Sequence, residues 1–232
     1  MGPKILYGIL MALGIFIVIT LIRAVFFLPK KRDTKPLEDE HVDVERVAKH
    51  LSGAIQIPTV SYPENEKIDW SQFEKFHKYL EDSYPLIHKT LERENVAEAS
   101  LLYRWKGKNP DLEPIALLSH QDVVPIEPGT EGDWTHEPFS GYNDGEFIWG
   151  RGALDMKNHL ICVMEAVEAL LEEGYEPERD VYLCFGHNEE VVASESAGAK
   201  AIMNTLKSRG IHLDSVIDEG GAILPVNVKH VL

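Results

Sequence analysis

Five residues of this chain have the types and the grouping of a metal site. His120 and Asp122 lie two positions apart, Asp155 ends a glycine-containing stretch, and Glu189 and Glu190 are adjacent. Histidine nitrogens and carboxylate oxygens are the ligands of hydrolytic zinc sites, in which the ion activates water and polarises a carbonyl group. The sequence therefore predicts a metal-dependent hydrolase.

Each of these residues also has a simpler interpretation. A single histidine after a strand is usually an ordinary hydrogen-bonded residue, and Asp155 before a helical pattern would by default cap that helix. Glu189 and Glu190 follow a very apolar run, where two carboxylates without a cation would repel each other. Asp218 and Glu219 follow a further apolar run and form either ligands or a plain turn. The metal interpretation depends on all of these residues occurring together.

Alternating helical and strand patterns provide the elements that must position these residues. Apolar side chains recur at helical spacing or form short runs typical of buried strands. The helical segments are 44–55, 73–84, 157–173 and 197–209, and the strand segments are 101–105, 115–118, 181–185 and 215–217. Gly174 and Gly210 are suited to end two of the helices. The expected fold class is α/β, with a mainly parallel sheet covered by helices on both faces.

The order of these elements explains why the candidate ligands belong together. In an open α/β sheet, ligands bind in the crevice beyond the carboxyl ends of the strands. His120, the Glu189–Glu190 pair and the Asp218–Glu219 pair each come just after a strand pattern. Asp155 is the exception, because it opens a helix, but its carboxylate can lean over the same crevice. If the strand geometry continues past His120, Asp122 faces the same way and can hold the second imidazole nitrogen.

Four motifs resemble those of a known family. The chain is similar to the di-zinc peptidases that include aminoacylases, glutamate carboxypeptidase and carboxypeptidase S, and it looks most like the branch of carboxypeptidase S and the N-acyl amino acid hydrolases. The resemblance begins near Val44 and covers the N-terminal part of such enzymes. The motifs that carry it are residues 118–125, 149–157, 188–191 and 217–221.

The resemblance implies a role for each residue of the site. His120 would bind one zinc ion, Asp155 would bridge two, and Glu190 would bind the second. Glu189 would be the general base and Asp122 would orient His120. Either Asp218 or Glu219 would complete the first zinc site, and the sequence leaves that choice open. The peptide bond between Asp155 and Met156 is a candidate for the cis form. The implied substrates are dipeptides and N-acyl amino acids, cleaved at the amide bond.

The chain also departs from the family pattern. Relatives continue into a lid domain, through which a homodimer can form, and contain a late histidine that completes the second zinc site. The sole histidine after Glu219 is His230, two residues from the last position. We therefore expect a fragment or truncated product in which the lid domain is absent and the catalytic domain is incomplete at its C-terminus. The alternative function is a non-catalytic, membrane-tethered remnant that binds zinc or a peptide.

Charge and the N-terminal sequence limit the partners and the location. The formal charge of -15 opposes a phosphate backbone, so no nucleic acid is expected as a partner. Residues 5–28 are apolar enough to span a bilayer and longer than the core of a typical signal peptide. We expect a short flank at 1–4, a transmembrane anchor at 5–28, a linker at 29–43 and the catalytic domain at 44–232. The basic residues after the anchor favour a cytoplasmic domain, whereas the family resemblance favours an extracytoplasmic one, which we adopt.

Overall fold

The computed structural model describes residues 2–27, 42–191 and 198–220. The chain divides into two units, Met1–Val42 and Asp43–Leu232, and each is described by itself. The first contains helix α1 (Pro3–Val25), whose most apolar 18-residue window has a mean hydropathy of 2.8. Its 23 residues give a length of about 35 Å, against about 30 Å for a hydrocarbon core. Helix α1 can therefore cross a membrane, although a signal sequence has the same properties. Most of the linker expected at 29–43 lies outside the described residues.

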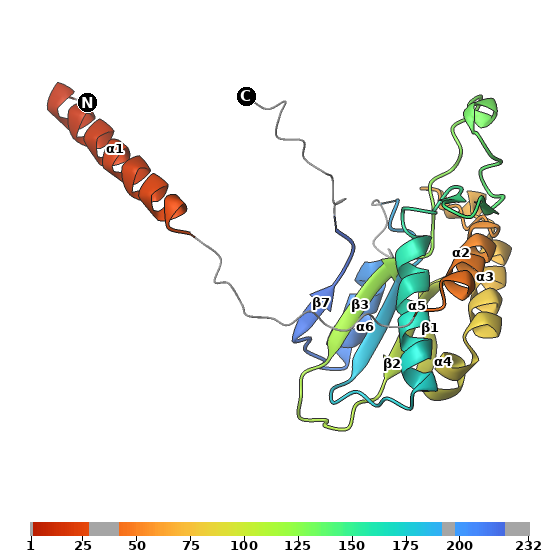
Figure 1. Ribbon diagram of the computed structural model, residues 1–232. Helices are drawn as coiled ribbons and strands as arrows, with labels where there is room; N and C mark the ends of the chain where they lie inside the picture. The colour runs from red at the N-terminus through yellow and green to blue at the C-terminus, as the bar shows by residue number, and fades with distance from the viewer. Residues whose placement is uncertain (1, 28–41, 192–197, 221–232) are drawn as a thin grey trace. The chain divides into compact units, whose positions relative to one another are not determined.

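The second unit is built on a five-stranded sheet (Figure 1). In spatial order, its strands are β1 (Glu92–Val96), β2 (Ser100–Trp105), β6 (Val181–Gly186), β3 (Ile115–His120) and β7 (Ser215–Ile217). The β1–β2 and β2–β6 pairings are antiparallel, whereas β6–β3 and β3–β7 are parallel.

The sheet is therefore mixed, and the expectation of a mainly parallel sheet is wrong. Strand β1 has the sequence Glu-Arg-Glu-Asn-Val and gives no apolar signal, because it lies at the sheet edge, where charged side chains are common. It turns into β2 through a short connection in which Ala97 has a φ of 52°. The hairpin forces the antiparallel pairing that the pattern of apolar runs does not reveal.

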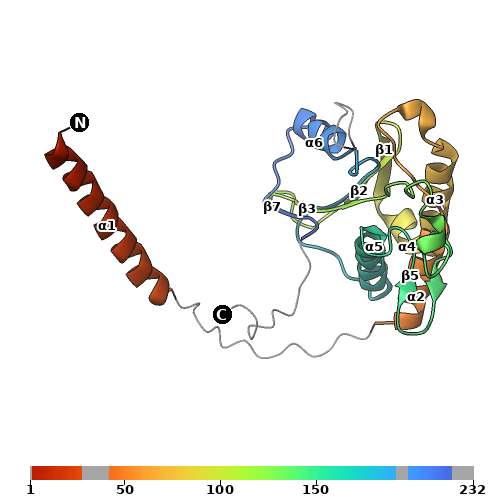
Figure 2. The same ribbon diagram turned by 90° about the horizontal axis from the view of Figure 1, so that it is seen from above.

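Helices cover both faces of the sheet, as expected (Figure 2). One core cluster joins one face of β2, β3 and β6 to four helices, and a second joins the other face to a single helix. The four helices are α2 (Val44–Ile55), α3 (Trp70–Ser83), α4 (Pro85–Thr90) and α5 (Lys157–Glu172), and the single helix is α6 (Gly198–Ser208).

The helix ends follow local chemistry. Asp43 caps α2 by accepting a hydrogen bond from the Arg46 backbone N–H at 2.9 Å. Gly174 and Gly210, after α5 and α6, have φ values of 74° and 69°, which suit glycine at the end of a helix. Pro85 ends the preceding helical pattern but immediately begins α4, because proline is favoured at the first position of a helix.

The long loop between β3 and α5 contains further short elements. These are the 3-10 helix η2 (Glu131–Asp133) and the hairpin of β4 (Tyr142–Asn143) and β5 (Ile148–Trp149). Another 3-10 turn, η1 (Asn65–Lys67), precedes α3. Elements of two or three residues are too short to produce a periodic pattern, so they could not be predicted.

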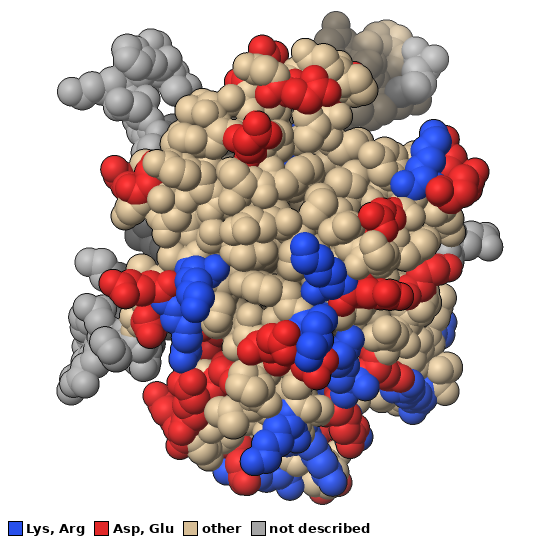
Figure 3. All heavy atoms as spheres, turned by 90° about the vertical axis from the view of Figure 1, so that its right-hand side faces the viewer, with Lys and Arg blue, Asp and Glu red and all other residues tan. Residues whose placement is uncertain are grey.

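Charged residues of both signs are interspersed on the face that carries α2 and α3 (Figure 3). Lys78 lies 2.8 Å from Asp82, and Arg46 lies 3.0 Å from Glu172. Exposed pairs of this kind each contribute less than about 1 kcal/mol. The stability of the unit therefore comes mainly from its apolar core clusters.

Lys157, the first residue of α5, is fully buried. Its Nζ donates hydrogen bonds to the carbonyl oxygens of Ala54 at 2.9 Å and Ile57 at 2.6 Å, and it lies 4.9 Å from the centroid of the Phe76 ring. Burial lowers the pKa of Lys157 to about 7, although the charge of Asp122 opposes that shift. This side chain ties the start of α5 to the end of α2.

Replacing Lys157 by Met is expected to lower the free energy of unfolding by on the order of 2 kcal/mol, because two buried carbonyl groups lose their donor while the methylene packing remains. Urea denaturation measures the difference. The matched control is Lys78→Met, which removes an exposed ion pair and should change stability by less than about 0.5 kcal/mol. Equal stability of Lys157→Met and wild type would contradict this interpretation of the buried amine.

Candidate metal centre

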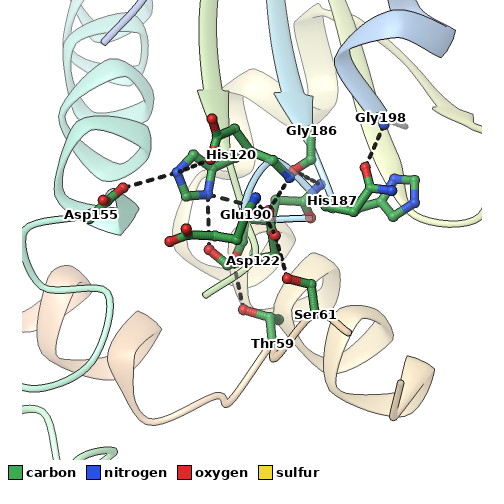
Figure 4. A network of polar contacts seen from close by, with 12 residues as sticks. Thr59, Ser61, His120, Asp122, Asp155, Gly186, His187, Glu190 and Gly198 are labelled. Atoms are coloured by element: carbon green, nitrogen blue, oxygen red, sulfur yellow. Dashed lines mark hydrogen bonds and ion pairs between the residues drawn. The ribbon is translucent and has the colours of Figure 1, made fainter. Parts of the chain in front are cut away.

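The candidate ligands meet at the carboxyl ends of the parallel strands (Figure 4). His120 is the last residue of β3 and is in register with Gly186, the last residue of β6. Glu189 and Glu190 therefore follow β6 at the same level of the sheet. Asp155 comes from the segment before α5, and in Figure 4 it approaches the His120 ring from the side of that helix. Residues far apart in the sequence thus converge at one edge.

The distances match those between ligands of a common ion. Nε2 of His120 lies 3.1 Å from Oδ1 of Asp155 and 3.8 Å from Oε2 of Glu189. Two ligands at about 2.1 Å from a tetrahedral zinc ion would lie roughly 3.4 Å apart. Ligand atoms within 4.8 Å of one another form two groups, His120 with Asp155 and Glu190, and His120 with Glu189 and Glu219. The two groups share His120.

The electrostatics of the site favour a bound cation. Burial opposes protonation of His120, but the nearby carboxylates of Asp122 and Glu189 outweigh it and raise the pKa of the imidazole to about 9. Burial also raises the pKa of Glu189 and of Glu190, and neighbouring carboxylates, including that of Asp155, add to both shifts. One imidazole among several carboxylates leaves an excess of negative charge. Its nitrogen and oxygen donors fit zinc.

Asp122 contacts the His120 ring and the backbone of both glutamates. It is fully buried, and its Oδ2 accepts hydrogen bonds from Ser61 Oγ at 2.7 Å and from the Glu190 backbone N–H at 3.2 Å. Its Oδ1 accepts the backbone N–H of Glu189 at 3.0 Å and lies 3.3 Å from Nδ1 of His120. Burial raises the pKa of Asp122, but the hydrogen bonds from His120 and Ser61 outweigh it and lower the pKa overall. Asp122 thus joins the His120 ring to the loop that carries both glutamates.

The tautomer of His120 follows from these contacts. Its Nδ1 lies 2.9 Å from the backbone carbonyl oxygen of Asp122, which can only accept a hydrogen bond. In the neutral imidazole, Nδ1 therefore carries the proton, and Nε2 is left with a free lone pair directed at Asp155. A metal ligand needs this arrangement.

Asp218 and Glu219 follow β7 and are both exposed. Glu219 contributes an oxygen to the second group of ligand atoms, whereas the Asp218 carboxylate accepts a hydrogen bond from the Glu219 backbone N–H at 2.8 Å. Within residues 2–27, 42–191 and 198–220, His120 is the one histidine that takes part in either group. His230 lies outside the described residues.

Sequence reasoning missed Ser61 and Lys157 as supports of the site. Ser61 lies in a loop far from the four motifs, and no periodic pattern links it to Asp122. Lys157 belongs to the motif containing Asp155, but the pattern gives no sign that its amine is buried. The expected cis peptide bond between Asp155 and Met156 is present.

An apolar pocket of about 520 Å³ adjoins the ligands. His120, Met156 and Glu189 line it together with apolar residues of β3, β6 and α6, such as Leu118 and Ile202. An apolar cavity therefore lies directly beside the candidate ligands.

The comparisons with known proteins place this fold in a peptidase family. Residues 116–227 match the model of peptidase family M20/M25/M40. The chain is 43% identical over 188 residues to carboxypeptidase S of Saccharomyces cerevisiae, covering 76% of this chain and 32% of that protein. It is 41% identical over 184 residues to the human N-fatty-acyl-amino acid synthase/hydrolase PM20D1, and this match covers 78% of this chain and 35% of that protein. The chain therefore carries a peptidase M20 family domain, similar to the carboxypeptidase S and N-acyl amino acid hydrolase branch.

Solved structures show the same fold. The M20 family metallo-carboxypeptidase Sso-CP2 from Sulfolobus solfataricus superposes with a TM-score of 0.59 at 21% identity, covering 76% of this chain and 37% of that one. Human carnosine dipeptidase 1 superposes with a TM-score of 0.57 at 16% sequence identity, and the match covers 76% of this chain and 38% of that one. The chain spans about a third of the length of the two curated relatives named above.

Zinc binding is expected to release a proton from His120, because the pKa of about 9 leaves the imidazole charged at neutral pH and a metal needs the neutral ring. The raised pKa also means that the charged imidazole stabilises the metal-free fold below pH 6.5, and that this contribution is lost as the pH rises through about 9. Because zinc competes with the imidazole proton, the apparent zinc affinity should rise up to about tenfold per pH unit below the pKa of His120. Competition with a chromogenic chelator between pH 6.5 and 8.5 measures the slope. An affinity independent of pH over that range would contradict the protonation state.

Proposed function

We propose that this protein is a zinc-dependent hydrolase of the amide bond in dipeptides or N-acyl amino acids. The observation that carries the proposal is the convergence of two ligand groups on His120 at the carboxyl ends of β3 and β6. The neutral imidazole of His120 has one free nitrogen and can bind a single ion, which leaves carboxylates of the two groups to hold a second ion, as in two-metal hydrolases. Support also comes from the M20 family match and from relatives whose names denote a carboxypeptidase and an N-fatty-acyl-amino acid hydrolase.

In this proposal each residue has a distinct task. His120, Asp155 and Glu190 hold metal, and the Asp218–Glu219 pair supplies a further ligand, with Glu219 the better placed. Zinc, when bound, would lower the pKa of water and polarise the scissile carbonyl. Glu189 accepts the proton of the attacking water and delivers it to the leaving amine. Its side chain is 49% exposed at the site, and its raised pKa suits a group that both takes and returns a proton. Asp122 orients His120 and fixes the loop that carries Glu189 and Glu190.

Metal content and turnover together test the proposal. For the complete enzyme, we expect about two zinc ions per protein molecule by elemental analysis, and release of free amino acid from N-acyl amino acids or dipeptides. The variant His120→Asn should lose both zinc and turnover, whereas the matched control His88→Asn, remote from the site, should keep both. One zinc ion and no turnover on any amide would instead favour a binding protein without catalysis.

We further propose that α1 is an uncleaved anchor and that the catalytic unit lies outside the cytoplasm. The length and apolar character of α1 support the anchor, and the family resemblance supports the extracytoplasmic side. Extraction of membranes with alkaline carbonate should leave the protein in the pellet, and its N-terminal sequence should still begin with the residues of α1. A soluble protein that begins after residue 28 would identify a cleaved signal sequence instead.

A further inference from the structure

Gln121 lies between His120 and Asp122 in the sequence but is not itself a candidate ligand. It is fully buried. Its Nε2 donates hydrogen bonds to the carbonyl oxygens of Ala99 and Phe185, both at 2.9 Å. Its backbone N–H donates to the carbonyl oxygen of Gly186 at 2.8 Å. One residue therefore joins the end of β3 to the start of β2 and to the end of β6.

The orientation of the Gln121 amide is fixed by its partners. Two carbonyl oxygens accept from the NH₂ group, so the Oε1 atom must accept from its own neighbour, which is Nε2 of His77 at 2.7 Å. His77 belongs to α3 and is buried. Burial lowers the pKa of His77 to about 4, although the hydrogen bond to Gln121 opposes the shift, so the ring is neutral and donates from Nε2. Every hydrogen-bonding atom of the amide is thus satisfied in one arrangement.

Thr59 holds the backbone of residues 121–123 from the other side. Thr59 Oγ1 donates a hydrogen bond to the Gln121 carbonyl oxygen at 2.6 Å, and the Val123 backbone N–H donates to the Thr59 carbonyl oxygen at 3.0 Å. Gln121 therefore sits between the 59–61 loop and the end of β6. Its neighbours in the sequence are His120 and Asp122, whose side chains meet at the candidate metal centre.

We propose that Gln121, held in place by His77, is a positioning residue that sets the spacing between the His120 loop after β3 and the Glu189–Glu190 loop after β6. Gln121 touches none of the candidate ligand atoms and acts through the carbonyl groups of Phe185 and Gly186, three to five positions before the two glutamates. The inference rests on the proposed metal centre. Ligand geometry at such a centre has a tolerance of about 0.5 Å, so a small shift between the two strand ends would weaken metal binding.

Cobalt(II) is a suitable probe, because its visible absorption reports the geometry of its ligands. In the full chain, Gln121→Met keeps the length of the side chain and removes its amide. We expect this variant to bind Co²⁺ about 10- to 100-fold more weakly, as is typical when residues that orient ligands are changed, and to show an altered visible spectrum. The matched control is Tyr84→Phe, which removes a buried hydrogen bond of 3.0 Å to Glu165 in another part of the unit. It should lower the melting temperature without changing the cobalt affinity or spectrum.

A second pair of variants tests the same contact from α3. His77→Phe removes the donor to Gln121 and should also weaken Co²⁺ binding and change the spectrum, whereas His77→Gln offers an amide donor and should restore part of the affinity. Wild-type affinity and spectrum in both Gln121→Met and His77→Phe would overturn the inference, as would failure of both variants to fold, which would mark a purely structural residue. If the wild-type protein itself bound no Co²⁺, the proposed metal centre would fail, an outcome distinct from the other two.

Discussion

Replacing Glu189 by Gln in the complete enzyme is expected to lower turnover about 10²- to 10⁴-fold while the zinc content stays unchanged, because a positioned general base contributes a factor of that size. Gln keeps the shape of the side chain but cannot accept a proton from water. The Glu189 carboxylate is close enough to act at the site, since its Oε2 lies 3.8 Å from Nε2 of His120. Steady-state turnover on an N-acyl amino acid, together with elemental analysis of zinc, measures both quantities.

The neighbouring residue provides the sharpest control. Glu190→Gln changes a group placed with His120 and Asp155, so it should lose zinc as well as turnover. Glu131→Gln lies in the exposed turn η2 and should change neither. Loss of zinc from Glu189→Gln would assign Glu189 to the ligands, and normal turnover would remove it from the mechanism.

The convergence of the candidate ligands could be predicted because each follows a recognisable element. His120, Glu189 and Glu219 come after apolar runs that form β3, β6 and β7, and parallel neighbouring strands must bring their carboxyl ends together. The helices that cover the sheet were predicted for the same reason, since α2, α3 and α5 each have a clear apolar face. The local sequence pattern was sufficient to predict the position of a residue wherever a single helix or strand determines that position.

Strand β1 and the buried contacts of Ser61 and Lys157 could not be predicted from the sequence, because they depend on contacts between distant segments. The charged strand β1 is a strand because β2 pairs with it, not because of its own composition. Likewise, Ser61 reaches Asp122 and Lys157 reaches Ala54 through the packing of separate elements. Such partners have no fixed spacing in the sequence. The residues that bind could therefore be predicted more readily than those that hold them in place.

Asp122→Asn tests a residue that holds the candidate ligands in place, and it is expected to weaken zinc binding about 10- to 100-fold. Each carboxylate oxygen of Asp122 accepts a backbone N–H, one from Glu189 and one from Glu190. An amide has one oxygen and one NH₂ group, so either orientation places a donor against a backbone donor. The orphaned N–H should lower the free energy of unfolding by about 1 to 3 kcal/mol. Zinc titration and urea denaturation of the variant measure the two effects.

The same substitution should also change the pH dependence of zinc binding. The Asp122 carboxylate raises the pKa of His120, so its removal lets that pKa fall, and the rise of zinc affinity with pH should end at a lower pH than in the wild type. Ser61→Ala is the matched control, because it removes one donor to Asp122 but leaves the charge in place. It should cost about 1 kcal/mol of stability and leave the pH profile where it was. If Asp122→Asn kept both the zinc affinity and the pH profile of the wild type, Asp122 would not be what orients His120, and the ring would be held by its bond to the Asp122 carbonyl oxygen alone.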